Sequence, residues 1–201
     1  MKLNFYLATK NPNKLREVRQ ILNDTGISVL PCPGSVVFPE ETGKTFEENA
    51  LMKARYLKSI LGDENVVGED SGLSVEKLNG LPGVLSARFA GGDCDDGENI
   101  NKLLGLLRDC GNVEDRKAEF VTVVAFAGPM EERIFRGTVK GFITFSPRGN
   151  GGFGYDPVFE IHGKGKTFAE LSAVEKNKLS HRAVAFRKLV DYMIKGYNKQ
   201  I

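Results

Sequence analysis

The sequence predicts an α/β fold in which helices flank a mixed β-sheet. Apolar residues recur at helical spacing in several segments, and these segments alternate with short strand-like runs along the first half of the chain. Two longer runs, residues 120–127 and 134–145, are rich in β-branched and aromatic residues and are joined by a turn at Gly128 and Pro129. We expect these runs to form an antiparallel pair, which would make the sheet mixed rather than wholly parallel.

The first two predicted elements are a strand over residues 3–8 and a helix that begins at Asn11. Asn11 is a good N-cap residue, and Pro12 suits the first helical position, where its missing N–H costs nothing. Apolar residues then recur at helical spacing over residues 15–22. The chain therefore starts with a strand–loop–helix unit that has a polar loop, residues 9–14, at its junction.

A second helix is predicted from Thr45, because Thr45 and Glu48 can form a capping box. Apolar residues follow at helical spacing and form one stripe along this helix. Asn49 and Lys53 lie four residues apart on the flank of that stripe. We therefore expect both side chains at the edge of a cleft rather than in the core.

Two further helices are predicted in the second half of the chain. One covers residues 99–107 with Asp95 or Asp96 as its N-cap, and the last covers residues 183–194. No repeat, low-complexity tract or linker interrupts the chain, so we expect a single domain over residues 1–201. In α/β folds of this kind, ligands bind where strands end and helices begin.

Composition restricts the class of protein. A hydrophobic content of 41% and a charged content of 27% are ordinary for a soluble globular chain of 201 residues. The net charge of only +2 argues against a nucleic-acid coat protein, which would carry a basic face or tail. We therefore expect no nucleic-acid partner. We also expect no membrane partner, because the longest apolar run, residues 121–128, is far too short to span a bilayer.

The cysteines point to a reducing compartment. Cys32, Cys94 and Cys110 are odd in number and are never spaced as C-x-x-C, so neither a disulfide framework nor a zinc site is expected. Polar residues from Asn4 onward also interrupt any apolar segment of the kind that a signal peptide needs. A cytoplasmic location fits these features best.

Basic side chains stand at three predicted helix starts, which is the unfavourable end of a helix for positive charge. The three stretches are residues 9–14, 175–178 and 180–182. Backbone N–H groups and ammonium groups at a helix start are typical of a phosphate site. Residues 9–14 alone are equally compatible with a capped helix and solvated lysines, and a pair such as His181 and Arg182 at a helix start is usually exposed to solvent. The Walker sequence G-x-x-x-x-G-K-[ST] is absent, so no kinase-type P-loop is predicted.

The carboxylates of Glu41 and Asp70 are the candidate metal ligands. Glu69 and Asp70 follow an apolar pair, so we expect a strand that ends in carboxylates. Mg²⁺ prefers a few carboxylates together with water and substrate phosphates, and a carboxylate beside such an ion can deprotonate an attacking water. The alternative is that Asp70 only caps a turn at Ser71.

The segment 148–157, with the sequence RGNGGFGYDP, combines four glycines with two aromatic residues. Glycines permit a close approach of the backbone to a ligand, and aromatic rings offer faces on which a base can stack. An ordinary connection between strands would need fewer glycines. A basic cluster, an acidic cluster and this loop together indicate a nucleoside triphosphate as substrate and its hydrolysis as the reaction.

Seven motifs occur in order along the chain and together resemble one family. They are TKNPNK at residues 9–14, TFEENA at 45–50, EDSGL at 69–73, LPGV at 81–84, SARF at 86–89, GFGYDP at 152–157 and SHRA at 180–183. Over essentially its whole length the chain resembles the inosine triphosphate pyrophosphatase family, the noncanonical purine NTP pyrophosphatases. Lys10 and Glu69 depart from the usual pattern, because many members carry a small residue and an Asp, respectively, at these positions.

The resemblance implies a homodimeric, Mg²⁺-dependent enzyme with an elongated α/β fold, in which two lobes enclose a central active-site cleft. Such an enzyme hydrolyses ITP, dITP or XTP to the monophosphate and pyrophosphate and clears deaminated purines from the nucleotide pool. On the matching positions, Asp70 is the proton acceptor, and Glu41 and Asp70 hold the metal. The implied substrate-binding residues are Thr9, Lys10, Asn11, Pro12, Asn13, Lys14, Lys53 and Ser71 on the phosphate side, and Phe153, Gly154, Tyr155, Asp156, Lys176, His181 and Arg182 on the nucleoside side, with Phe153 stacked on the purine.

Two other functions remain possible from the sequence. One is a pyrophosphatase for modified pyrimidine nucleotides on a similar fold, which a substrate profile would distinguish. The other is a non-catalytic nucleotide sensor or an RNA-binding module, in which the carboxylates of Glu41 and Asp70 would be dispensable.

Overall fold

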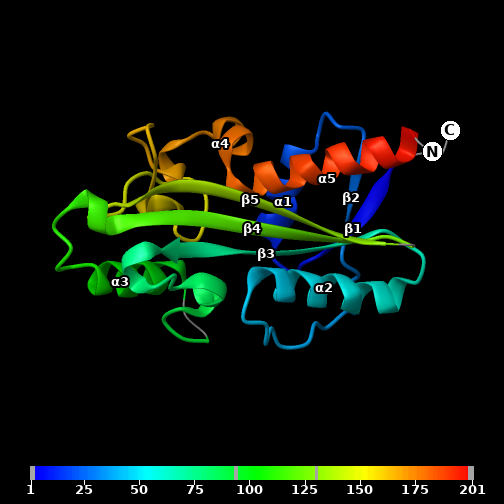
Figure 1. The fold of residues 1–201 in the computed structure, drawn as a ribbon, viewed down its shortest axis with the longest axis horizontal. Coiled ribbons are helices and arrows are strands. Elements are labelled where there is room, and N and C mark those ends of the chain that lie inside the picture. The colour runs from blue at the N-terminus through cyan, green and yellow to red at the C-terminus, as the bar shows by residue number, and fades with distance from the viewer. Residues whose placement is uncertain (1–2, 93–94, 130, 199–201) are drawn as a thin grey trace. The chain divides into compact units, whose positions relative to one another are not determined.

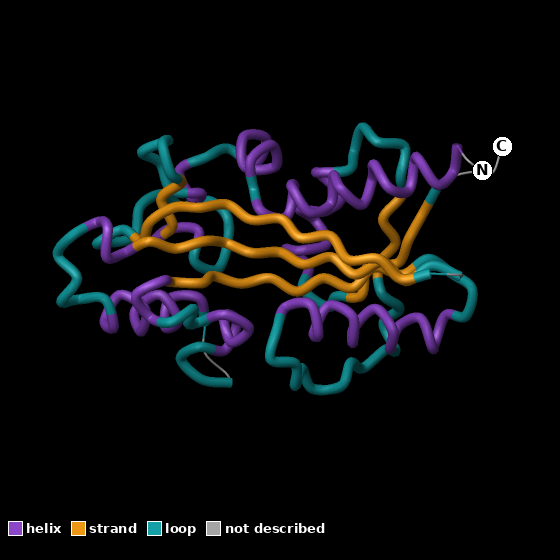
Figure 2. The backbone as a smooth tube through the Cα atoms, in the orientation of Figure 1, coloured by secondary structure: helices purple, strands orange, loops and turns teal. Residues whose placement is uncertain are grey.

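The computed structural model describes residues 3–92, 95–129 and 131–198, so Cys94 lies outside the described residues. The chain divides into two compact units. Figures 1 and 2 show the course of the chain and its helices and strands. The first unit consists of Met1–Asp70, Thr122–Gly137 and His181–Ile201, and the second of Ser71–Val121 and Thr138–Ser180. The expectation of one domain over residues 1–201 stays a prediction.

The strands of the described residues form one mixed sheet, as the sequence predicts, in the order β2-β1-β3-β4-β5-β6. β1 pairs in parallel with β2 and with β3, whereas β5 and β6 are antiparallel. The predicted strand pair corresponds to β4 and β5, which are neighbours in the sheet. The strands are β1 (Asn4–Ala8), β2 (Ser28–Pro31), β3 (Val66–Val75), β4 (Lys117–Ala127), β5 (Glu132–Ile143) and β6 (Phe159–Ile161).

Helices flank this sheet. None of those in the described residues is long and apolar enough to cross a membrane. The α-helices are α1 (Pro12–Ile21), α2 (Phe46–Leu61), α3 (Asp96–Leu106), α4 (Ala173–Leu179) and α5 (His181–Asn198).

Capping residues explain where the helices begin. The side chain of Asn11 caps α1, and Thr45 and Glu48 form the predicted capping box of α2. Asp95, and not Asp96, caps α3. α5 begins at His181, two residues before the predicted start. The short strands β2 and β6 were not predicted, because segments of three or four residues carry too little periodicity to identify.

In the first unit, α1 and α5 cover one face of the sheet and α2 covers the other (Figure 1). Gly68 of β3 permits the close approach of α2, because a Cβ there would lie 2.0 Å from the carbonyl oxygen of Ala50. Gly137 of β5 does the same for α5, where a Cβ would lie 2.2 Å from the carbonyl oxygen of His181. These two contacts fix the distance of each helix from its strand.

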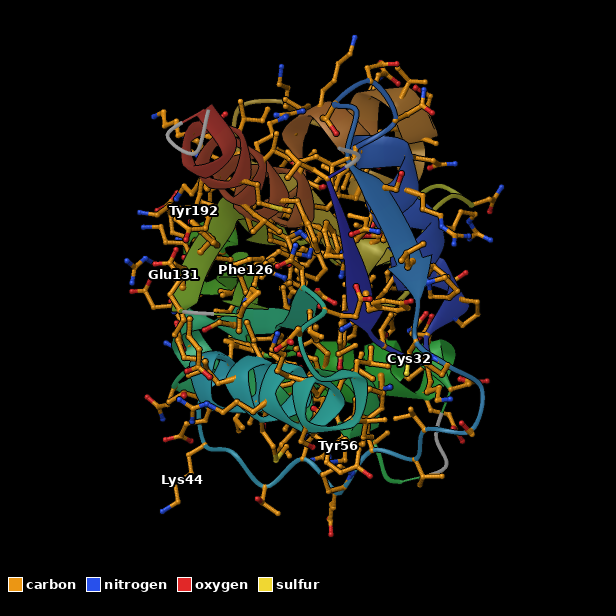
Figure 3. The ribbon with its side chains drawn as sticks, turned by 90° about the vertical axis from the view of Figure 1, so that its right-hand side faces the viewer. Cys32, Lys44, Tyr56, Phe126, Glu131 and Tyr192 are labelled. Carbon is orange, nitrogen blue, oxygen red and sulfur yellow. The ribbon has the colours of Figure 1, made fainter. Side chains whose placement is uncertain are left out.

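An aromatic cluster holds the C-terminal half of α5 in the first unit. The ring centroid of Tyr192 lies 5.7 Å from that of Phe126 and 5.5 Å from that of Phe135. The hydroxyl of Tyr192 also donates a hydrogen bond to the carboxylate of Glu131 (Figure 3). The helix is therefore anchored by packing well away from its first residues.

The second unit has its own apolar core and a buried arginine that fixes α3. The guanidinium of Arg116 donates hydrogen bonds to the carbonyl oxygens of Leu107 (2.7 Å), Ile143 (2.7 Å) and Thr144 (2.8 Å). Leu107 follows the last residue of α3, and Ile143 ends β5. Arg116 therefore joins the C-terminal end of α3 to the sheet.

Candidate functional site

Asp70 lies within β3 rather than at the end of a strand. β3 continues to Val75, and Leu73 and Val75 are buried in the core of the second unit, so the predicted strand end and the alternative of a turn cap are both wrong. The Asp70 carboxylate is buried. Its Oδ1 accepts a hydrogen bond from Lys53 Nζ at 3.0 Å, and its Oδ2 accepts one from Asn49 Nδ2 at 3.2 Å.

Asn49 and Lys53 are buried, with 0% and 7% of their surface exposed, which corrects the expectation of an open flank position. The close approach at Gly68 is the physical reason. Gly68 stands two residues before Asp70 and brings α2 against β3, so the two polar side chains of the helix meet the carboxylate of the strand.

Glu41 shares the ammonium of Lys53 with Asp70. Lys53 Nζ lies 3.0 Å from Glu41 Oε1 and 3.0 Å from Asp70 Oδ1. Two carboxylates that converge on one cation suit Mg²⁺, which fills its other positions with water and phosphate oxygens. Among the described residues there is no group of three or more His, Cys, Asp or Glu side chains that could hold a metal ion.

The electrostatics of this cluster favour a basic Asp70. Burial raises the pKa of the Asp70 carboxyl, and the Lys53 ammonium opposes this rise without cancelling it. Burial also acts against the charge on Lys53, but Asp70 and Glu41 outweigh it and raise the pKa of the ammonium. A carboxylate with a raised pKa is a better proton acceptor than a solvated one.

A second ionic network in the first unit is built on Glu69. Arg182 Nη2 lies 3.0 Å from Glu69 Oε1, and Arg182 Nη1 donates to Glu17 Oε2. Lys14 Nζ forms an ion pair with the other oxygen of Glu69 at 3.0 Å. Glu17, Glu69 and Arg182 are all buried. The network therefore joins α1, β3 and α5, the three elements that carry these charges.

The charges of this network stabilise one another. Burial alone would raise the pKa of Glu69, but Arg182 and Lys14 outweigh it and hold the pKa well below its usual range. Burial likewise acts against the Arg182 guanidinium, and Glu69 and Glu17 outweigh it and raise its pKa. Contact of Arg182 with the nucleoside stays a prediction. Sequence reasoning missed Glu17, although its place three residues after Lys14 puts both on one face of α1.

The loop of residues 9–14 forms the start of α1 as predicted. Asn11 Oδ1 accepts hydrogen bonds from the N–H groups of Asn13 (2.9 Å) and Lys14 (3.3 Å), with Pro12 at the first helical position. Thr9 Oγ1 accepts one from the N–H of Asn11 at 3.1 Å. The first turn of α1 holds no acidic residue, so its positive end lacks a compensating carboxylate of its own.

Lys10 is engaged with the backbone of a neighbouring segment. Its Nζ donates hydrogen bonds to the carbonyl oxygens of Pro33 (3.1 Å) and Gly34 (2.9 Å). These two bonds connect the loop of residues 9–14 to the chain that follows β2. A phosphate contact of Lys10 stays a prediction.

In the second unit, Asp156 organises the glycine-rich loop. Its Oδ2 accepts hydrogen bonds from the N–H of Phe153 at 2.8 Å and from Lys176 Nζ at 2.6 Å. Gly152 has a φ of +75°, and a Cβ there would lie 2.0 Å from this same oxygen, so the loop requires glycine at this position. The Lys176 ammonium also lies 4.9 Å from the centroid of the Phe153 ring. The structure thus brings Phe153, Asp156 and Lys176 together.

Lys176 does not stand at a helix start, which corrects the prediction for residues 175–178. Ser172 caps α4, and Glu175 occupies its first turn. Lys176 and Lys178 lie in the last turn of this short helix, where positive charge is favourable. The other two basic stretches do stand at the starts of α1 and α5.

The remaining predicted residues are Tyr155, Gly154, Ser71 and His181. Tyr155 is buried in the core of the second unit, and its hydroxyl donates to the carbonyl oxygen of Ser86 at 2.9 Å. The N–H of Gly154 donates to Asp96 Oδ2 at 2.6 Å. Ser71 follows Asp70 in β3, and His181 is the buried first residue of α5. Direct contact of these side chains with a substrate stays a prediction.

Comparison with known proteins places the chain in a family. The model of the Ham1 family matches residues 5–192. The chain belongs to the Ham1 family. This Ham1-family chain is 45% identical to the dITP/XTP pyrophosphatase of Thermoanaerobacter sp. (strain X514) over 195 residues. The aligned region covers 96% of this chain and 98% of that relative. This chain is 47% identical over 186 residues to the dITP/XTP pyrophosphatase of Bacillus subtilis (strain 168), covering 91% and 93% of the two chains.

Solved structures of the Ham1 family share the fold. A HAM1 protein from Coxiella burnetii superimposes with a TM-score of 0.86 at 39% identity, covering 96% of this chain and 99% of that one. The Staphylococcus aureus Ham1 protein gives a TM-score of 0.82 at 40% identity over the same shares. The mixed α/β sheet described above is therefore the fold of this family.

Proposed function

We propose that this Ham1-family chain is a Mg²⁺-dependent enzyme that hydrolyses noncanonical purine nucleoside triphosphates. Its substrates would be dITP, XTP and ITP, and its products the monophosphate and pyrophosphate. The names of its relatives, dITP/XTP pyrophosphatase, support this activity. The observation that carries the proposal is the buried Asp70 carboxylate, which shares the Lys53 ammonium with Glu41.

Glu41 and Asp70 would hold the Mg²⁺ ion. When bound, the ion would supply positive charge to the phosphate oxygens. Lys14 and Lys53 would add two further positive charges for the triphosphate and for the leaving pyrophosphate. The single charge of Lys53 balances only one of the two converging carboxylates, and the negative charge that is left would attract a metal cation.

Asp70 would accept the proton of the water that attacks the α-phosphorus. The hydrogen bonds from Asn49 and Lys53 hold the two oxygens of this carboxylate in place, and its raised pKa increases its basicity. Phosphoryl transfer needs the attacking and leaving oxygens in line, so a fixed carboxylate contributes by orienting the water as well as by taking its proton.

Selectivity for the base would come from stacking and from hydrogen-bond donors. Phe153 would stack on the purine. His181 and Arg182 would donate to the 6-oxo oxygen of hypoxanthine or xanthine. Adenine carries an amino donor at that position, which would face these donors in place of an acceptor oxygen, and such a pairing is unfavourable.

We further propose that the enzyme is a homodimer, as the family resemblance implies, and that it acts in the cytoplasm, as the cysteine pattern indicates. Mass measurement by light scattering tests the dimer: about twice the 22.1 kDa of the chain supports it, and the mass of a single chain contradicts it.

The proposed activity is tested by assaying phosphate and pyrophosphate release from dITP, XTP, GTP, ATP and dUTP, each with Mg²⁺ and with EDTA. We expect release of pyrophosphate, and not of single phosphates, from dITP and XTP in strong preference to the others. EDTA should abolish it. Preference for dUTP would instead indicate a pyrimidine nucleotide pyrophosphatase. Nucleotide binding without any release would indicate a sensor.

A further inference from the structure

The carboxylate of Asp96 is not used to cap the helix that it begins. Asp95 is the N-cap of α3: its Oδ1 accepts the N–H of Glu98 at 2.8 Å, and Glu98 Oε2 accepts the N–H of Asp95 at 2.9 Å. This capping box is complete without the neighbouring carboxylate. The side chain of Asp96 is therefore available for another contact.

That contact is with the glycine-rich loop. Asp96 Oδ2 accepts a hydrogen bond of 2.6 Å from the N–H of Gly154, 58 residues further along the chain. The preceding N–H, that of Phe153, donates to Asp156. The N–H groups of the consecutive residues Phe153 and Gly154 thus donate to two carboxylates, one from Asp156 and one from Asp96. Hydrogen bonds to an ionised acceptor are roughly twice as strong as neutral ones.

Asp96 also stands on a fixed element. Arg116 joins the far end of α3 to β5. In the first turn of α3, Asn99 Oδ1 accepts the N–H of Ala90 at 2.8 Å. The positive end of the α3 dipole lies at Asp96 and favours its negative charge. A fixed helix therefore carries the acceptor, and the glycine-rich loop carries the donor.

We propose that Asp96 is a positioning residue for nucleoside binding, which acts by holding the loop of residues 149–156 so that Phe153 presents its ring to the base. This inference rests on the proposed function and specifies which residue outside the loop maintains the base site. Asp96 does not itself contact the substrate. The experiment must distinguish this positioning role from a purely structural role, in which Asp96 only stabilises α3.

The test compares Asp96→Ala, Asp96→Asn and the control Asp95→Ala in the full-length protein. The readouts are KM and kcat for dITP, the inhibition constant of inorganic tripolyphosphate, and Tm. For Asp96→Ala we expect KM for dITP to rise about tenfold, as one charge-assisted hydrogen bond would give. The inhibition constant of tripolyphosphate should not change, because that ligand has no base.

The other two variants separate positioning from stability. Asp96→Asn keeps an oxygen acceptor for the Gly154 N–H and should recover most of the lost affinity. Asp95→Ala should lower Tm through the lost cap while KM stays near the wild-type value, because the bond to Gly154 is intact.

Three outcomes would overturn the inference. An unchanged KM in Asp96→Ala, with an active wild-type enzyme, would remove the positioning role and leave the proposed function standing. Equal losses for dITP and tripolyphosphate, or an equal rise of KM in Asp95→Ala, would assign Asp96 to general stability. A wild-type protein that neither hydrolyses nor binds dITP would overturn the proposed function, and the positioning role with it.

Discussion

Gly68 of β3 and Ala50 of α2 are in such close contact that a Cβ on the glycine would lie 2.0 Å from the alanine carbonyl oxygen. This contact brings Asn49 and Lys53 to Asp70. We predict that Gly68→Ala lowers the free energy of unfolding by about 1–3 kcal/mol or more, because the helix must move away from the strand. Activity should fall as well, since the carboxylate loses its two hydrogen-bond donors. Urea unfolding and turnover check both effects.

Gly105 provides the control for Gly68. It is a glycine of α3 with no atom within 4 Å of the place where a Cβ would lie. We expect Gly105→Ala to stabilise the protein by about 0.5–1 kcal/mol, because alanine favours a helix. A loss of stability from Gly105→Ala equal to that from Gly68→Ala would show that the close approach at β3 is not the cause.

The ion network on Glu69 predicts how stability depends on pH. Burial acts to raise the pKa of Glu69, but Arg182 and Lys14 outweigh it and lower the pKa. A carboxyl whose pKa is lower in the folded protein contributes stability above its unfolded pKa of about 4.5 and loses it as pH falls further. In metal-free buffer we expect Glu69→Gln to cost about 3–5 kcal/mol at pH 7 and to weaken this acid dependence.

Glu64 is an exposed glutamate close to Glu69 in sequence and serves as its control. Glu64→Gln should leave the free energy of unfolding within about 0.5 kcal/mol of wild type at every pH. If Glu69→Gln also left the free energy of unfolding unchanged, the buried network would not stabilise the first unit.

Much of the fold could be predicted from local signals. The caps of Asn11 and Thr45 place the starts of α1 and α2 correctly, because capping depends on residues three or four apart. β3 was predicted too short. Its second half is buried among residues distant in sequence, and two carboxylates in mid-strand read locally as a strand end.

The sequence identified the residues of the candidate site but did not show which of their side chains contact one another. Asp70, Glu41 and Lys53 were all identified, but the burial of Lys53 between the two carboxylates depends on the packing at Gly68. Arg182 and Glu69 are 113 residues apart, so no local pattern shows that they bind each other. The contacts of Glu17 with Arg182 and of Asp96 with Gly154 were missed for the same reason.

Metal binding is tested at Glu41. We predict that Glu41→Gln raises the Mg²⁺ concentration for half-maximal turnover by roughly tenfold or more, because one of two carboxylate ligands is lost. Glu40 is the adjacent, exposed glutamate and provides a matched control. Glu40→Gln should leave the Mg²⁺ dependence as it is in wild type. An equal effect of both substitutions would point to general charge loss rather than to ligation.

Base stacking is tested at Phe153. We predict that Phe153→Ala weakens dITP binding by about 1–3 kcal/mol, measured by calorimetry, because the stacking surface is lost. Phe145, an exposed phenylalanine of the second unit, is the control, and Phe145→Ala should leave binding unchanged. Normal affinity in Phe153→Ala would place the base elsewhere.

The most direct test of Asp70 as the proton acceptor is to measure the turnover and the nucleotide affinity of Asp70→Asn in the presence of Mg²⁺. Asparagine keeps the shape of the side chain and an oxygen acceptor for Lys53, but it cannot take a proton from water. We predict that turnover of dITP falls by about 10²–10⁴-fold while dITP still binds with an affinity within about tenfold of wild type. Turnover close to the wild-type rate would contradict Asp70 as the proton acceptor.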